Sequence, residues 1–296
     1  MNVLFATDGS ASSEQARALI ASISWPTPTH IEVLYVDQFL DGDLDLPAGK
    51  YAAEHEKIRQ ETDTQLASVK RALTAAGRDI ETTLLLGGRP ASVIVDEAQR
   101  TKADLVIVGS HGRGPFASAL IGSVAAEVVD HAPCPVLVAR RPALGGVVLA
   151  DDGSDGAKEA EQLIARSPFL RGAPLRTVTV YSLTPLYSSL EPGAFIGGDV
   201  YQELIDDLAE DADRTAADAK KRLAALGVTV TAEVREGNAA QEIIAAANDA
   251  RADLIVIGSR GRTGLQRLLL GSVARNVLFH APCSVLLVRA HSTKTA

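Results

Sequence analysis

The residues of this 296-residue sequence best suited to bind an anion are two sets of glycine and serine with the same spacing. Each set reads Gly-x-x-Gly, nine residues, and then Gly-Ser. The sets are Gly109, Gly112, Gly122 and Ser123, and Gly258, Gly261, Gly271 and Ser272. Glycine opens backbone N–H groups to phosphate oxygens, because no Cβ intervenes and positive φ is accessible. A Gly-Ser pair at a helix start adds free N–H groups, a hydroxyl and the positive helix end.

The repeated spacing predicts phosphate binding at both places. The alternative interpretation is that the glycines only form tight turns and that Ser123 only caps a helix. Other nucleotide and catalytic motifs are absent: the sequence has no GxxxxGK[ST] loop, no GxGxxG after a first strand, and no HExxH, CxxC or GxSxG. These absences argue against a P-loop, a dinucleotide site, a zinc site and a hydrolase nucleophile elbow.

The two motifs belong to a longer repeat. Ala103–Arg140 and Ala252–Arg289 align without a gap and are identical at 20 of 38 positions, and Phe5–Ser10 (FATDGS) recurs as Leu149–Ser154 (LADDGS). Two copies of about 145 residues indicate a domain duplication rather than a solenoid of short repeats. We therefore predict two domains, residues 1–142 and residues 143–296.

Short apolar runs alternate with longer helical patterns in each half, which is typical of β-α-β units around a parallel sheet. We expect an α/β fold of two tandem doubly wound (Rossmann-like) domains, each a five-stranded parallel sheet of order 3-2-1-4-5 with about four helices. The expected strands are Val3–Ala6, Ile31–Val36, Thr82–Leu86, Leu105–Val108 and Val136–Val138, and then Val147–Ala150, Arg176–Tyr181, Thr229–Val234, Leu254–Ile257 and Val285–Val288. The expected helices of the first half are Ser13–Ala21, Tyr51–Ala76, one from Pro90, and Ser123–His131.

This topology predicts where a ligand would bind. In a doubly wound sheet, ligands bind at the carboxyl ends of the strands where the strand order reverses, here between the first and fourth strands. The segments that leave those strands are Thr7–Ser10 and Gly109–Gly114. Both consist mainly of small residues, so a site is favoured there over a simple turn.

Composition narrows the function further. Lys+Arg 29 against Asp+Glu 37 gives a net charge of −8, which disfavours binding to nucleic acid. No apolar run approaches the ~18 residues of a membrane span, and the first residues do not resemble a signal peptide. With only two cysteines, the sequence suggests a cytoplasmic protein without a disulfide framework.

The pattern resembles the universal stress protein family in its ATP-binding, tandem-domain form, and the resemblance covers the chain once per half. It rests on FATDGS and LADDGS, the turns GRPA and GNAA, the two glycine–serine motifs, and HAPCPVLV with HAPCSVLLV. The resemblance implies an ATP site in each half, with Mg²⁺ bound through the phosphates rather than by protein side chains. It also implies that the last strands of the two halves pair and that two chains form a homodimer.

By this resemblance, Ala6, Thr7 and Asp8 would lie beside the adenosine, Asp8 near the adenine or a metal-bound phosphate, and Val36 would touch the adenine. The first implied site comprises Ala6, Thr7, Asp8, Val36, Val108, Gly109, His111, Gly112, Arg113, Gly122, Ser123 and Val124. The second comprises Ala150, Asp151, Asp152, Ser182, Ile257, Gly258, Arg260, Gly261, Arg262, Gly271, Ser272 and Val273.

Two differences between the implied sites bear on affinity. Ser182 is taken as the counterpart of Val36, and an unpartnered hydroxyl beside adenine would weaken binding. Against this, the second loop carries Arg260, Arg262 and Arg267, which favour a polyphosphate. We expect both sites to bind and the second to hold the nucleotide better.

Other conspicuous side chains have plainer interpretations. Asp8 and Asp152 could only cap the turn that follows them. His131 and His280 fit a helix C-terminus, and Cys134 and Cys283 fit small buried positions.

The favoured function is an ATP-binding regulator in the stress response, with at most slow hydrolysis, because no general base stands beside the phosphate motifs. An enzyme that hydrolyses ATP or adenylates a substrate is one alternative, with Pro185–Gly198 as its only candidate acceptor loop. A nucleotide-free interaction module is the other. The choice between ATP, AMP and a cyclic nucleotide stays open.

Overall fold

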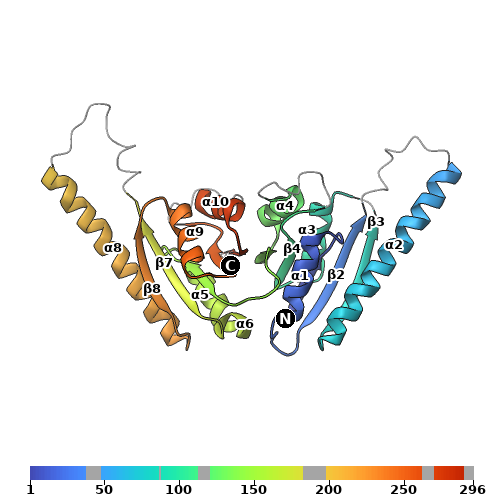
Figure 1. Ribbon diagram of the computed structural model, residues 1–296, viewed down its shortest axis with the longest axis horizontal. Coiled ribbons are helices and arrows are strands. Elements are labelled where there is room, and N and C mark those ends of the chain that lie inside the picture. The colour runs from blue at the N-terminus through green and yellow to red at the C-terminus, as the bar shows by residue number, and fades with distance from the viewer. Residues whose placement is uncertain (38–47, 87, 113–120, 183–197, 262–269, 290–296) are drawn as a thin grey trace, which may run out of the picture. The chain divides into compact units, whose positions relative to one another are not determined.

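A computed structural model describes residues 1–37, 48–86, 88–112, 121–182, 198–261 and 270–289 (Figure 1). The chain divides into two compact units, Met1–Leu144 and Gly145–Ala296. In each unit helices cover both faces of a parallel sheet, which confirms the expected α/β class.

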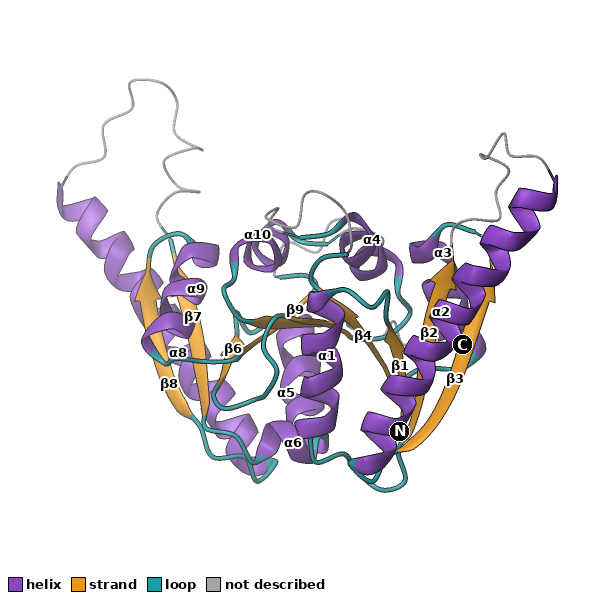
Figure 2. Ribbon diagram, turned by 45° about the vertical axis from the view of Figure 1, so that its right-hand side comes forward, coloured by secondary structure: helices purple, strands orange, loops and turns teal. Residues whose placement is uncertain are grey.

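The sheet of the first unit has the order β3-β2-β1-β4-β5, and all of its neighbouring strands are parallel. Helices α1 and α2 contact one another on one face, and α3 and α4 contact one another on the other (Figure 2). The strands are β1 (Asn2–Ala6), β2 (His30–Asp37), β3 (Asp79–Leu86), β4 (Leu105–Gly109) and β5 (Val136–Ala139). The helices are α1 (Ala11–Ser22), α2 (Ala48–Ala75), α3 (Pro90–Arg100) and α4 (Ser123–His131).

The second unit repeats this order as β8-β7-β6-β9-β10, again parallel throughout. The expected order 3-2-1-4-5 is therefore confirmed in both units. The strands are β6 (Val147–Ala150), β7 (Leu175–Tyr181), β8 (Thr231–Glu236), β9 (Leu254–Gly258) and β10 (Ser284–Val288). The helices are α5 (Asp155–Arg166), the unforeseen short α6 (Pro168–Arg171), α8 (Gly198–Ala225), α9 (Ala239–Asp249) and α10 (Ser272–His280).

The central strands are apolar because both of their faces are buried. Leu4 and Phe5 in β1 and Ile107 in β4 are wholly inaccessible to solvent, and so are Ile255 and Val256 in β9. A strand covered by helices on both sides needs no polar face, so its sequence is a continuous apolar run.

The register brings the carboxyl ends of the first and fourth strands of each unit together. Ala6 pairs with Val108 in the first unit, and Ala150 pairs with Ile257 in the second. The second strand lies on the other side of the first, so the strand order reverses at this point. The loops that follow β1 and β4, and those that follow β6 and β9, therefore leave the sheet side by side.

Candidate functional site

The two loops of each unit meet through an aspartate and a glycine. The Oδ1 of Asp8 accepts the Ser10 N–H at 3.0 Å, and a methyl group added to Gly112 would lie 3.0 Å from the Oδ2 of Asp8. In the second unit Asp152 accepts the Ser154 N–H at 3.0 Å, and the corresponding distance from Gly261 is 2.6 Å. Each aspartate caps its own turn with one oxygen, as the plainer interpretation held, and turns the other toward the glycine loop.

The first loop also needs its own glycine. Gly9 has φ 71° and Gly153 has φ 75°, a left-handed backbone conformation that a side chain disfavours. This conformation lets the aspartate before each glycine reach the N–H of the serine after it. The Asp-Gly-Ser repeat is therefore a turn with a defined geometry.

Ser10 and Ser154 join the two loops of the candidate site, although neither was among the site residues implied by the resemblance. Their hydroxyls cap α1 and α5 by accepting the N–H of Ser13 and of Ala157. The same hydroxyls donate to the second loop, Ser10 Oγ to the His111 carbonyl at 3.2 Å and Ser154 Oγ to the Arg260 carbonyl at 3.4 Å. The signal was available, because the serine recurs after Asp-Gly in both copies.

Gly109 and Gly258 are glycines because a helix passes directly over them. A methyl group on Gly109 would lie 2.6 Å from the Ser12 hydroxyl and 2.9 Å from α1 backbone atoms, and one on Gly258 would lie 2.7 Å from the Gly156 carbonyl carbon. The structure thus gives these two glycines a packing role. They hold the start of α1 or α5 against the end of the fourth strand.

The Gly-Ser pairs differ from the expectation in one respect. Gly122 is the N-cap of α4 and Ser123 its first helical residue, so Ser123 is not the cap. The Gly122 N–H is not free either, because it donates to the Ser110 carbonyl at 2.7 Å, and Gly271 donates likewise to Ser259 at 2.8 Å. These bonds fix where each helix begins relative to the loop.

No side chain of the described residues caps α4 or α10, in contrast to α1, α5 and α9. The N–H groups of the first helical turn have no acceptor within a helix. In α4 these include the N–H groups of Ser123 and Val124, and in α10 those of Ser272 and Val273. The two uncapped helix starts lie beside the aspartate–glycine contacts, since Gly122 is packed against Gly112 and Gly271 against Gly261.

The strand register corrects the assumed counterpart of Val36. Ala6 pairs with Leu34 and Ala150 with Val178, so Val180 in β7 takes the place of Val36 in β2. Ser182 lies two residues farther on, after β7 ends. The argument that a hydroxyl replaces an apolar side chain in the second site is therefore wrong. The offset of 144 residues that relates Ala6 to Ala150 also relates Val36 to Val180, so the segments between the first two strands have equal lengths and the repeat itself predicts Val180.

Several of the implied site residues can be placed only in part. The Ser110 hydroxyl oxygen lies 2.9 Å from Nδ1 of the His111 ring, and the backbone N–H of His111 donates to Ser12 Oγ at 3.0 Å. In the second unit Arg260 takes the place of His111. Arg113, Arg262, Arg267 and residues 185–197 lie outside the described residues.

The universal stress protein family model matches residues 1–140 and again residues 146–289. The chain belongs to the universal stress protein family. It is 31% identical over 232 residues to universal stress protein Rv2005c of Mycobacterium tuberculosis, covering 75% of this chain and 74% of that protein. Over 144 residues it is 35% identical to universal stress protein MJ0531 of Methanocaldococcus jannaschii, covering 48% of this chain and 81% of that protein.

The fold is shared with solved members of the family. A universal stress protein from Archaeoglobus fulgidus superposes with a TM-score of 0.68 at 21% identity, covering 98% of both chains. The family includes ATP-binding members. Family membership therefore explains the duplicated fold.

Residues outside the loops behave as structural elements of this family fold. His131 and His280 lie at helix C-termini, where Nδ1 approaches the Glu127 carbonyl at 2.9 Å and the Asn276 carbonyl at 2.8 Å. Cys134 and Cys283 are buried, as expected of small core residues.

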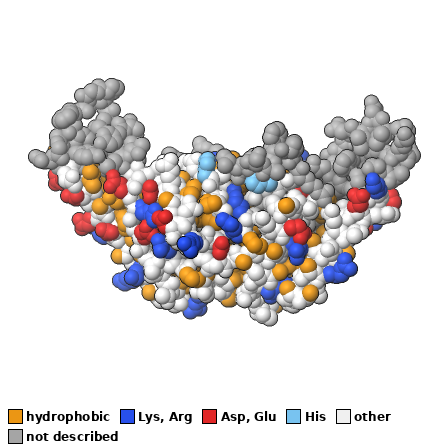
Figure 3. Space-filling model, viewed as in Figure 1, with side chains coloured by type: hydrophobic (Ala, Val, Ile, Leu, Met, Phe, Trp, Pro, Cys, Tyr) orange, Lys and Arg blue, Asp and Glu red, His pale blue; other side chains and the backbone are white. Residues whose placement is uncertain are grey.

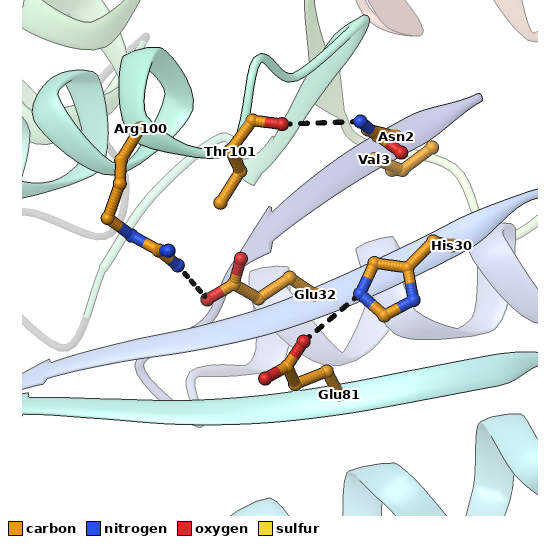
Figure 4. Close-up of a pocket in the computed structure, with 7 residues that line it drawn as sticks. All are labelled: Asn2, Val3, His30, Glu32, Glu81, Arg100 and Thr101. Carbon is orange, nitrogen blue, oxygen red and sulfur yellow. Dashed lines mark hydrogen bonds and ion pairs between the residues drawn. The ribbon is translucent and has the colours of Figure 1, made fainter.

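A cavity of about 160 Å³ lies away from the candidate loops, at the amino end of the first unit's sheet. Figure 4 shows His30 turned toward Glu81 and Arg100 turned toward Glu32 across it, at 3.2 Å and 3.6 Å. These side chains pair with one another, and the motifs with repeated spacing are all at the opposite edge of the sheet. We therefore place the candidate site at the loops and not in this cavity.

The described residues contain no metal-binding cluster, and the face drawn in Figure 3 has no strip of basic side chains. Among the described residues no three His, Cys, Asp or Glu side chains could together hold a metal ion. Figure 3 shows basic and acidic side chains interspersed rather than separated by sign. Within the described chain, no helix combines the length and apolarity that a bilayer crossing requires.

Proposed function

We propose that this universal stress protein binds ATP at two equivalent sites, one in each unit, and acts as a nucleotide-dependent regulator in the stress response. One observation carries the proposal: in both units an aspartate, a glycine loop and an uncapped helix start converge at the carboxyl ends of the first and fourth strands. Such a point in a doubly wound sheet is where ligands bind.

The phosphates would bind at the start of α4 and of α10. There the N–H groups of Ser123 and Val124, or of Ser272 and Val273, lack a side-chain cap, and the helix dipole favours negative charge. A Cβ at Gly112 or Gly261 would meet the carboxylate of Asp8 or Asp152, so glycine lets the two loops of each unit approach one another next to these helix starts. The residues therefore fit a polyphosphate.

Bound Mg²⁺ would neutralise part of the phosphate charge and would be held through phosphate oxygens. Asp8 caps its own turn through the Ser10 N–H and His111 contacts the Ser110 hydroxyl, and we assign the role of general base to neither. Phosphoryl transfer requires a positioned nucleophile as well as charge stabilisation. We therefore propose a regulator with at most slow hydrolysis, rather than an enzyme.

Substitution of aspartate for the first residue of α4 or α10 tests whether phosphate binds at these helix starts. Ser123→Asp and Ser272→Asp place a negative charge where the phosphate would bind, while an acidic residue at a helix start does not destabilise the helix. Ala239→Asp makes the same change at the first residue of α9, whose start is capped by Asn238, and serves as the control.

Isothermal titration with Mg-ATP should give two binding sites for the wild-type protein, one for each single variant, and none for the double variant. The Ala239→Asp protein should keep two. Mass spectrometry of the denatured wild-type protein should detect co-purified ATP. Wild-type protein that binds no ATP at millimolar concentration would support the nucleotide-free interaction module instead.

A further inference from the structure

The second unit contains a buried cluster of charged side chains directly beneath its Asp-Gly-Ser loop. The side chain of Asp151 is 0% exposed and that of Glu161, on α5, is 2% exposed. Arg222 on α8 holds Glu161 through two bonds, Nε to Oε2 at 2.9 Å and Nη2 to Oε1 at 2.7 Å. The same Nη2 is 3.9 Å from Asp151 Oδ2, which is too far for a hydrogen bond.

One oxygen of this cluster lacks a donor. Asp151 Oδ1 accepts the Gly153 N–H at 2.8 Å, but the buried Oδ2 has no hydrogen-bond partner among the described residues. Asp151 and Glu161 approach the same Nη2 atom of Arg222, at 3.9 Å and 2.7 Å, and two ionised carboxylates have no proton to offer one another. A single proton on this pair would supply the missing donor.

The charge balance favours the same proton. Two ionised carboxylates against the one guanidinium of Arg222 would leave a net negative charge in a buried site, which is costly. Burial, and then the neighbouring Glu161 carboxyl, raise the pKa of Asp151 to about 7, although Arg222 acts in the opposite direction.

Apart from Arg222, the described elements next to this cluster contribute two hydroxyls on β7 and, through its effect on Arg222, one carboxylate on α8. Strand β7 contributes the hydroxyls of Thr177 and Thr179, which are buried and have no partner within the described structure. On α8, the carboxylate of Asp218 raises the pKa of Arg222 and does not act among the main causes on Asp151. The groups that set the charge are therefore Asp151, Glu161 and Arg222.

The first unit has no such cluster. The residues at the corresponding positions are Thr7, Arg17 and Ala72. The Thr7 hydroxyl donates to Ser13 Oγ at 3.1 Å and accepts the Gly9 N–H at 3.3 Å, and Arg17 pairs with Glu14 at 2.8 Å. The first loop thus keeps the same turn with a neutral side chain.

We propose that Asp151 and Glu161 form a proton-binding site beneath the second nucleotide loop, so that a bound proton strengthens ATP binding to the second unit and not to the first. Asp151 precedes Asp152, the residue that faces Gly261, so an ionised Asp151 adds negative charge beside the place where the phosphates would bind. Neutralising it removes that repulsion. The coupling rests on the proposed ATP binding, whereas the proton site does not.

Proton binding is tested first, without nucleotide. In the full-length protein labelled with ¹³C-aspartate, the Asp151 carboxyl resonance, assigned by its loss in Asp151→Asn, should titrate near neutral pH. Titration near pH 4, where Asp ordinarily ionises, would overturn the proton site.

The coupling is tested by ATP titration at pH 6 and pH 8 in the two single-site proteins. Ser123→Asp leaves only the second site and Ser272→Asp only the first. The terminal phosphate of ATP titrates in this range too and affects both proteins equally. We expect ATP affinity to fall about tenfold more in Ser123→Asp than in Ser272→Asp between these pH values, a usual size for coupled sites.

Adding Asp151→Asn or Asp151→Thr to the Ser123→Asp protein should remove this excess, since asparagine mimics the neutral acid and threonine is the residue of the first unit. An equal pH dependence at the two sites would overturn the coupling. Failure of ATP to bind at either site would overturn the proposed function and the coupling with it, and the resonance of Asp151 would still decide the proton site.

Discussion

The carboxylate of Asp152 lies against the backbone of Gly261, so close that a methyl group on this glycine would be 2.6 Å from Oδ2. The two residues come from loops at opposite ends of the second repeat, and the parallel register of β6 and β9 brings them together. The first unit has the same contact, which there joins Asp8 and Gly112. A turn cap alone requires one carboxylate oxygen, so the repeated placement of the second oxygen is the feature that marks a site.

Gly261→Ala should weaken ATP binding at the second site at least tenfold. The added methyl group forces Asp152 to rotate and breaks its bond to the Ser154 N–H. The loss of one such hydrogen bond costs about 1 kcal/mol of stability. Titration calorimetry and thermal unfolding would measure the two effects.

Gly145→Ala is the matched control for this substitution. A methyl group there would also lie 2.6 Å from a carboxylate oxygen, that of Asp253, which accepts the Gly145 N–H at 2.8 Å. Gly145 precedes β6 and so lies at the opposite end of the strand from the candidate loops. The Gly145→Ala protein should lose about as much stability as the Gly261→Ala protein and keep its ATP affinity unchanged. A comparable loss of ATP affinity in both variants would contradict the role given to Gly261.

Gly258→Ala should destabilise the second unit by about 3 kcal/mol, because the methyl group would meet α5 backbone atoms at 2.7 Å to 3.1 Å and overpacking of this kind forces the backbone to shift. Gly172→Ala, whose nearest neighbour would be 3.6 Å away, should change stability by less than about 0.5 kcal/mol. Urea denaturation of both variants would show the contrast, and equal midpoints would refute the packing role.

Arg222→Ala should also destabilise the second unit by about 3 kcal/mol, because Glu161 stays buried without its counter-charge. Arg214 lies on the same helix and pairs with Asp211, but its side chain is 66% exposed. Arg214→Ala should therefore cost less than about 1 kcal/mol. A similar cost for both would show that the buried ion pair contributes nothing special.

Stability should depend on pH through Asp151. Its pKa is about 7 in the folded protein and near the ordinary 3.8 when unfolded, so the folded state retains the proton over this range and the unfolded state releases it. The free energy of unfolding of the wild type should therefore fall relative to Asp151→Asn as the pH rises from 4 to 7, by at most about 4 kcal/mol, and change little above pH 7. Parallel stability curves for the two proteins would contradict this assignment.

The strands and their order could be predicted because burial on both faces demands apolar runs, which are visible in the sequence. The helix start at Ser123 was also predictable, although the cap turned out to be Gly122. The counterpart of Val36 was misjudged, although the offset of 144 residues that relates Ala6 to Ala150 leads from Val36 to Val180, so the sequence already contained this answer.

The contacts that make the site specific were beyond the sequence. The bond from Ser154 to Arg260 joins residues 106 apart, and the pair Glu161 and Arg222 joins residues 61 apart on different helices. Only the packing of α8 over β7 and α5 makes the second contact possible. The repeat did not reveal the pair of Glu161 and Arg222, because the first copy has Arg17 and Ala72 at these positions and so lacks the acid and the base.

The most direct test is a crystal structure of the protein with Mg-ATP bound. The account predicts a nucleotide in each unit, with phosphate oxygens on the N–H groups of Ser123 and Val124 and on those of Ser272 and Val273. Phosphates bound elsewhere, for instance beside Arg100 in the cavity at the amino end of the first sheet, would contradict it.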